Sequence, residues 1–232
     1  MPYAKTAVFW FIGLLGILLL GFWRTYFSVI FGEMHPTHHL HSIAMLGWVL
    51  LLIHQAWRIR GKKLAAHRKV GKLAWIIAPL VVITGTWVTL HNAAGFEDPT
   101  HPAAMSIFWL GWASVIVFGA LFALAMKHRK NAQYHGRYMI ATALVFLIPG
   151  LGRALSQYLP TVGVKAPSFF QMLFIPLIIS LLLIAYEWRT DRIRSPFVVF
   201  SVLWGLTLLL WVLLPKFGFW ESFTIWANSL GV

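Results

Sequence analysis

The sequence predicts an all-α integral membrane protein, a bundle of seven transmembrane helices that forms a single domain over residues 1–232. Of its residues, 59% are hydrophobic and only 11% are charged, whereas roughly a quarter of the residues of soluble domains are charged. Long apolar stretches recur along the chain, each near the ~20 residues that cross a bilayer. Lys and Arg gather in short blocks between alternate apolar stretches, which is typical of loops that stay in the cytoplasm.

The apolar stretches define the expected membrane spans. They cover residues 6–31, 41–57, 73–92, 105–126, 138–158, 168–187 and 197–214. Prolines inside three of them are tolerated in membrane helices, because neighbouring groups satisfy the freed backbone carbonyls. The first stretch, after MPYAK, lacks a small-residue cleavage site, so we interpret it as a membrane helix rather than a signal peptide. No low-complexity linker divides the chain.

The loops predict the orientation. The segments RIRGKKLAAHRKVGK, KHRKNAQYHGR and EWRTDRIRSP carry most of the basic residues, and the alternate loops are nearly free of Lys and Arg. Positive loops stay inside, so we expect a cytoplasmic N-terminus, an outer C-terminus and a bacterial inner-membrane location. The net charge of +13 then reflects topology and lipid headgroups, with the bilayer and no nucleic acid as partner. The HR and HGR segments are interpreted as topology signals or lipid-phosphate contacts. A homo-oligomer is compatible with this sequence.

Histidines concentrate on the predicted outer face. The segment GEMHPTHHLHS contains four, and two more fall near the next outward loop. Imidazole is a common ligand of transition metals, and helical spacing would place His38 and His41 on one face. The candidate metal ligands are His38, His41 and His91, with His39, His35 and His101 as further candidates. An interfacial or proton-responsive histidine patch is the alternative.

The metal centre would be haem b or a copper or iron ion, with zinc less favoured. Imidazole suits all of these metals, and because the chain has no cysteine and no clear Met pair, the choice among them stays open. HPTHH resembles one box of the di-iron membrane desaturases, but the other boxes are missing, and that family's boxes face the cytoplasm. His41 and His54 are 13 residues apart, which is similar to the haem-ligand spacing of di-haem cytochromes b. A second such pair is missing, so His54 is a candidate for one haem or for a hydrogen bond inside the bundle.

Arg153 lies within the expected outer half of the fifth span. An arginine in hydrocarbon costs at least ~2.5 kcal/mol and usually faces the bundle interior or a cavity. The acidic residues all fall near the predicted membrane surfaces. We therefore expect Arg153 to bind an anionic group of a cofactor or substrate, or a quinone carbonyl. Snorkelling to the outer headgroups is the alternative.

Several residues follow one another at characteristic intervals along the chain: His41, Gln55, the HRKVG of residues 67–71, His135, Met139 and Arg153. This pattern resembles a bacterial family of inner-membrane proteins of unknown function. That family shows HRxxG after a helix containing Gln, then HxxxM and an Arg 18 residues after its His. The resemblance covers about half of the chain. It implies a membrane architecture and a role for Gln55, His67 and His135, but no reaction.

Together these features favour a membrane redox protein, an oxidoreductase with a histidine-ligated haem b, copper or iron centre at the outer face. Quinone or another small lipophilic substrate would be its partner. One alternative is a metal-free carrier or receptor for a small anionic or lipid-like ligand. Another is a metal-dependent membrane hydrolase in which Asp98 or Glu97 would activate water.

Overall fold

The computed structural model describes the chain except residues 1, 96–97, 99–100, 191–193 and 231–232. Every regular element in the described part is a helix, which confirms the all-α prediction. The α-helices are α1 (Ala7–Phe22), α2 (Pro36–Arg60), α3 (Leu64–Gly71), α4 (Ala74–Ala94), α5 (Pro102–Lys127), α6 (Ala132–Val145), α7 (Leu147–Tyr158), α8 (Phe169–Thr190), α9 (Ser195–Leu213) and α10 (Phe219–Ser229). Short 3-10 helices are η1 (Pro2–Lys5), η2 (Phe27–Val29), η3 (Pro160–Val162) and η4 (Leu214–Phe217).

The helices suit a bilayer. In the described chain, 6 helices are long and apolar enough to cross a membrane. They are Pro36–Arg60, Ala74–Ala94, Ala104–Lys127, Ala132–Val162, Phe169–Thr190 and Ser195–Leu213, and Ala7–Phe22 is a shorter apolar helix. Large apolar side chains also point outward, such as Trp10 and Trp188, which are 73% and 72% exposed. The protein is therefore a multi-pass membrane protein whose outer surface contacts lipid.

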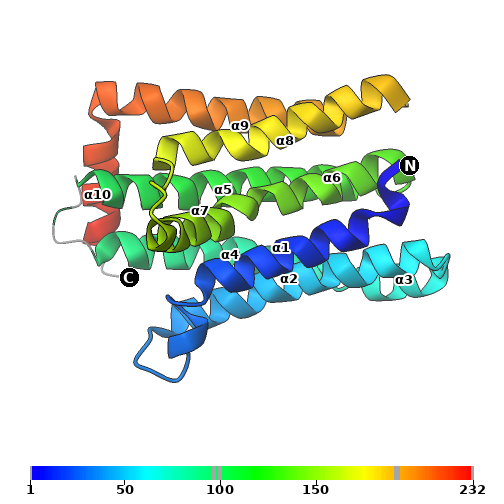
Figure 1. The fold of residues 1–232 in the computed structure, drawn as a ribbon, viewed down its shortest axis with the longest axis horizontal. Helices are drawn as coiled ribbons and strands as arrows, with labels where there is room; N and C mark the ends of the chain where they lie inside the picture. Colours follow the sequence, from blue (N-terminus) through cyan, green and yellow to red (C-terminus); the bar gives the residue numbers. More distant parts are fainter. Residues whose placement is uncertain (1, 96–97, 99–100, 191–193, 231–232) are drawn as a thin grey trace.

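The long helices run side by side along one axis. α1 packs against α2 and α7, α2 against α4, α4 against α5, α5 against α6, and α8 against α9. The N-terminus and α3 lie at one end of the bundle, and α10 and the C-terminus lie at the other (Figure 1). We call these the α3 end and the α10 end.

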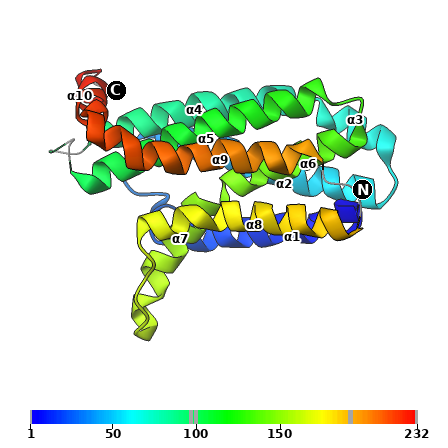
Figure 2. The same ribbon diagram turned by 90° about the horizontal axis from the view of Figure 1, so that it is seen from above.

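The expected span at 138–158 is broken in two. α6 ends at Val145 and α7 begins at Leu147, because Pro149 has no N–H to donate to the Val145 carbonyl and its ring crowds that carbonyl. The Phe146 N–H instead bonds the Ala143 carbonyl at 3.2 Å. Figure 2 shows α7 leaving the bundle at an angle after this break.

The first expected span, 6–31, is also shorter than predicted. α1 ends at Phe22, and the chain then turns, with the Ser28 N–H bonded to the Trp23 carbonyl at 2.9 Å. The apolar residues beyond Phe22 thus form a folded connection between α1 and α2. Where α1 meets α7 the backbones touch, since a Cβ at Gly21 would overlap the Gly150 carbonyl. Only glycine fits such an approach.

A buried ion pair joins α6 to α8. Arg137 and Glu187 are both fully buried and form a salt bridge. Arg137 also donates to the Gln133 carbonyl at 3.0 Å, and Glu187 accepts from the Arg194 N–H at 3.2 Å. Arg137 of the HGR segment thus has a packing role inside the bundle, which the interpretation of that segment as a topology signal or lipid contact does not include. Its partner Glu187 lies 50 residues further along the chain, so no local pattern predicts the pair.

Candidate ligand-binding cavity

A cavity of about 520 Å³ lies among the helices near the α10 end. Its walls come from α1, α2, α4 and α5, from the α1–α2 connection, and from the α6–α7 break. Most of the lining is apolar, and a few polar side chains face the space: Tyr26, His38, His41, Ser42, Thr89, Asn92, Ser114 and Arg153. An apolar cavity with a few convergent polar groups is the usual form of a small-molecule site.

The polar groups sit above an apolar floor. Along α2, the lining runs from His38 and His41 to Met45 and Leu46, a rise of about 12 Å along a helix. Along α5 it runs from Ile107 to Phe118. The deeper lining residues of α2 and α4 are apolar, and on α5 Ser114 lies among apolar residues, so the cavity suits a molecule with an apolar body and a polar head turned towards the α10 end.

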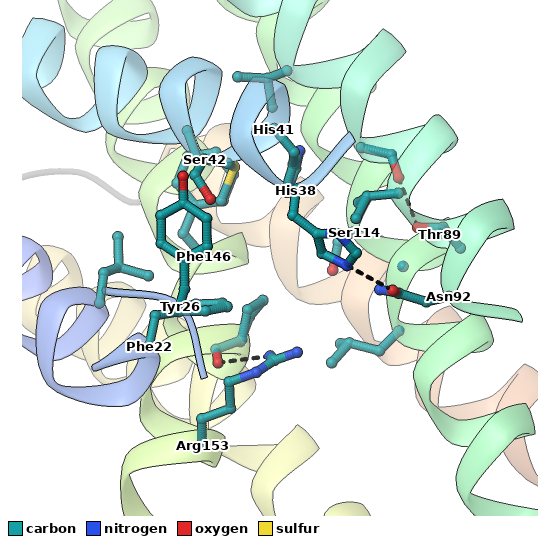
Figure 3. A pocket seen from close by; sticks show the side chains of 18 of the residues that line it. Phe22, Tyr26, His38, His41, Ser42, Thr89, Asn92, Ser114, Phe146 and Arg153 are labelled. Carbon is teal, nitrogen blue, oxygen red and sulfur yellow. Dashed lines mark hydrogen bonds between the residues drawn. The ribbon is translucent and has the colours of Figure 1, made fainter. Parts of the chain in front are cut away.

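Arg153 enters the cavity from α7 (Figure 3). The side chain is partly buried, its Nη1 donates to the Pro149 carbonyl at 3.1 Å, and its guanidinium lies 4.5 Å from the centre of the Phe22 ring. No carboxylate pairs with Arg153 in the part of the chain that the structure describes. Arg153 is thus a cation in an apolar cavity, with no anionic partner among the described residues.

His41 also lines the cavity, and a threonine orients it. Its Nδ1 lies 3.2 Å from the Thr84 hydroxyl oxygen, and that hydroxyl donates to the Leu80 carbonyl at 2.6 Å. Gly85 gives the ring room, because a Cβ there would come within 3.4 Å of its Cε1 and 2.9 Å of a Val115 methyl. His41 is therefore held between α2 and α4 with its ring against the cavity.

The remaining histidines of α2 do not join His41. His38 Nε2 bonds the Asn92 side-chain oxygen at 3.1 Å at the cavity wall (Figure 3). His35 precedes α2 as its N-cap, with its Nδ1 accepting from the Thr37 N–H at 3.4 Å. His39 Nδ1 instead meets the Tyr26 hydroxyl at 3.1 Å and fastens the α1–α2 connection to α2. His38 and His39 thus bond different partners, and neither bond involves His41.

His91 contacts His35 and His38. The His35 and His91 rings stack with centroids 3.9 Å apart, and His38 meets the His91 ring edge-on at 5.4 Å. The structure therefore brings His91 to His35 and His38, whereas His41 faces Thr84. Among the described residues, no group of three or more His, Cys, Asp or Glu side chains is placed to hold a metal ion. The expected ligand set of His38, His41 and His91 gains no support from this arrangement.

The residues of the acidic loop that the structure describes include Asp98 and His101, which are exposed and do not line the cavity. Glu97 lies outside the described residues. The set proposed for metal-dependent hydrolysis therefore has no support in the described part of the chain.

Four residues that the sequence singles out lie towards the α3 end, away from the cavity lining: His54, Gln55, His67 and His135. His54 Nε2 accepts from Arg58 Nε at 3.1 Å, and His135 Nδ1 donates to the Ala125 carbonyl at 2.9 Å. These contacts favour hydrogen bonds within the bundle over a second haem. His54 Nδ1 is buried without a partner in the described residues.

The HRKVG motif has a structural explanation at Gln55. With its amide turned to satisfy both neighbours, Gln55 donates to the His67 carbonyl at 3.1 Å and to the His67 ring. Its oxygen accepts from the Gly71 N–H at 2.8 Å. The buried Gln55 therefore fastens α3 to α2, and the spacing of His67 and Gly71 matches that of the two contacts.

Sequence reasoning missed Thr84, Asn92 and Ser114. Thr84 and Asn92 each bond a histidine that the sequence singles out, and the buried Ser114 hydroxyl at the cavity has no partner in the described structure. Their residue types are common in membrane helices. Only their position opposite α2 reveals their role.

No protein-family model matches the chain, and comparisons with curated proteins and with solved structures found no match. The resemblance to the inner-membrane family of unknown function therefore stays an expectation. A function must be inferred from the cavity and the side chains that line it.

Acidification should destabilise the His35–His91 contact. Partial desolvation of the ring and the nearby His91 and His38 lower the pKa of His35. A lowered folded-state pKa means that this contribution is complete above the unfolded value of about 6.5 and is lost as pH falls through the folded pKa. Thermal unfolding in detergent, followed between about pH 7.5 and pH 5, should show a smaller acid-induced loss for His35→Asn than for the wild type.

The asparagine of His35→Asn can still accept the hydrogen bond that caps α2. The wild type and the variant therefore differ mainly in the imidazole ring of His35, which titrates. Burial and the neighbouring His135 also lower the pKa of His67, and this background is common to both proteins. Equal acid-induced losses would contradict the prediction.

Proposed function

We propose that this protein binds a small lipophilic molecule whose head carries an oxygen acceptor, in an anionic, carbonyl or hydroxyl group, in the cavity near the α10 end. The observation that carries the proposal is Arg153, a cation that lines an apolar cavity and has no carboxylate partner in the described chain. Leaving such a charge without a partner in a low-dielectric interior is costly. A ligand oxygen at Arg153 would remove that cost, and the apolar floor would take the rest of the molecule.

The proposal includes a membrane topology. α1 would add a seventh crossing, because it lies alongside α2 and α7 in the bundle although it has only 16 residues. The basic α3 segment and the N-terminus share one end (Figure 1), so the positive-inside rule places both in the cytoplasm. The cavity then lies towards the outer face, and in a bacterium this membrane would be the inner one.

A matched set of ten-carbon amphiphiles tests the proposal. Decanoate, decanol and decyltrimethylammonium share a tail and differ in the head group. In lipid nanodiscs, decanoate should raise the midpoint of thermal unfolding by about 5 °C near saturation, since a ligand that binds only the folded state stabilises it. Decyltrimethylammonium should give no such rise. Equal stabilisation by the anionic and cationic amphiphiles, or no stabilisation by decanoate, would contradict a site built around Arg153.

A redox function is a second candidate, favoured by His41. Thr84 holds its Nδ1, so His41 would bind the iron of haem b through Nε2 and Arg153 would hold a propionate. Protein purified from haem-replete cells would then show a Soret band, absent in His41→Ala. A colourless protein that still binds decanoate would favour the carrier or receptor function. A copper or iron ion without haem is less well supported, because the described residues contain no group of three or more His, Cys, Asp or Glu side chains placed to bind it.

A further inference from the structure

We infer that the head of the ligand combines an oxygen for Arg153 with an O–H or N–H donor for His41, and that Thr84 sets this requirement. The inference rests on the proposed function, because it concerns the same cavity. A hydroquinone or a hydroxylated acid has such a head, whereas a quinone or a simple ester has acceptors alone.

The hydrogen bonds of Thr84 fix the tautomer of His41. A threonine hydroxyl has one proton, and that proton is used at the Leu80 carbonyl, 2.6 Å away. The Thr84 oxygen can therefore only accept from His41 Nδ1, which lies 3.2 Å from it. Nδ1 must carry the N–H of the neutral imidazole, and Nε2 is left with a lone pair.

The surroundings favour the neutral ring. A charged imidazole would add a second cation to an apolar cavity that already contains Arg153, with no carboxylate among the described lining residues. Such a charge is strongly disfavoured by desolvation. In the described structure, Nε2 bonds no protein group. It is therefore an acceptor that only a donor from the ligand or water can satisfy.

Arg153 and His41 thus offer a ligand opposite kinds of hydrogen-bonding group. Arg153 offers donors alone and His41 offers an acceptor, from α7 and α2 respectively. A buried group left without its partner costs more than the hydrogen bond itself contributes. A ligand without a donor would leave His41 Nε2 unsatisfied, so the site discriminates between molecules of equal size and hydrophobicity.

The oxidised and reduced forms of one probe test whether the ligand needs a hydrogen-bond donor. Decyl-benzoquinone and its hydroquinone share a skeleton, but only the hydroquinone has O–H donors. Under anaerobic conditions, the wild-type protein should bind the hydroquinone at least tenfold more tightly than the quinone. Equal affinities for the two forms would overturn the inference, even if decanoate still binds and the proposed function stands.

Thr84→Val removes the acceptor without changing the shape of the side chain. The Nε2–H tautomer then becomes accessible and can donate to a quinone, so the preference for hydroquinone should fall several-fold. Thr84→Ser should retain it. Thr207→Val is a matched control, because the buried Thr207 hydroxyl likewise bonds the carbonyl one turn earlier, that of Leu203 at 3.1 Å, and Thr207 does not line the cavity.

A measurement without ligand separates the two proposals. The ¹⁵N chemical shifts of His41 should show a protonated Nδ1 and an unprotonated Nε2 in the wild type, and mixed tautomers in Thr84→Val. An Nε2–H ring in the free wild-type protein would overturn the inference. If no amphiphile binds, the proposed function fails while the tautomer can still be read.

Discussion

Replacing Glu187 by Ala should destabilise the folded protein by about 3–5 kcal/mol, because it removes the carboxylate that pairs with the buried Arg137 guanidinium. Both side chains of this pair are fully buried. The carboxylate also accepts the Arg194 N–H, so the substitution removes a contact from the start of α9 as well. The loss should appear as a much lower unfolding midpoint in detergent, with helix content retained in the folded fraction.

The double variant Arg137→Met, Glu187→Leu gives the control. Removing both charges together leaves no isolated ion, and apolar replacements of a buried pair are often neutral or stabilising. The double variant should therefore recover most of the stability lost in Glu187→Ala. If the single variant is as stable as the wild type, or if the double variant is the less stable of the two, the pair has no such role.

Replacing Arg153 by Met should weaken decanoate binding by about 10- to 100-fold, which corresponds to the loss of one charge-assisted hydrogen bond. The same substitution should leave the ligand-free protein at least as stable as the wild type, because it removes a desolvated cation that has no carboxylate partner in the described residues. Binding and stability would thus change in opposite directions.

Opposite changes distinguish a binding role from a structural one. If Arg153 only held α7 in place through the Pro149 carbonyl, both quantities would fall together. Arg153→Lys retains the charge but lacks the planar fork, so it should bind decanoate at an intermediate level. Thermal unfolding with and without decanoate measures both quantities in one series.

Much of the helical layout can be predicted from apolar length alone. The expected spans 73–92 and 168–187 match α4 and α8 to within a few residues, because lipid excludes unpaired backbone groups and so enforces helices. Two of the expected spans end at other residues than the helices in the structure, and each difference has a local cause. Pro149 interrupts the fifth stretch, and the residues after Phe22 turn back over α2.

The site is less completely predictable, because spacing on one helix does not give the direction of a ring. His38 and His41 do both line the cavity, as helical spacing predicts. His91, however, stacks on His35, and His41 turns to Thr84. Such partners lie on another helix, and the sequence does not specify which face of α4 meets α2. The interior position of Arg153 is predictable because its charge would be costly in lipid.

The break at Phe146 connects the path of the backbone to recognition. The bend before Pro149 leaves α7 inclined to the rest of the bundle (Figure 2), and Arg153 lies on that inclined helix, one turn after the proline. Its guanidinium donates to the Pro149 carbonyl, so the residue that breaks the helix also anchors the cation at the edge of the cavity. The direction in which Arg153 points is therefore set by the path of the backbone.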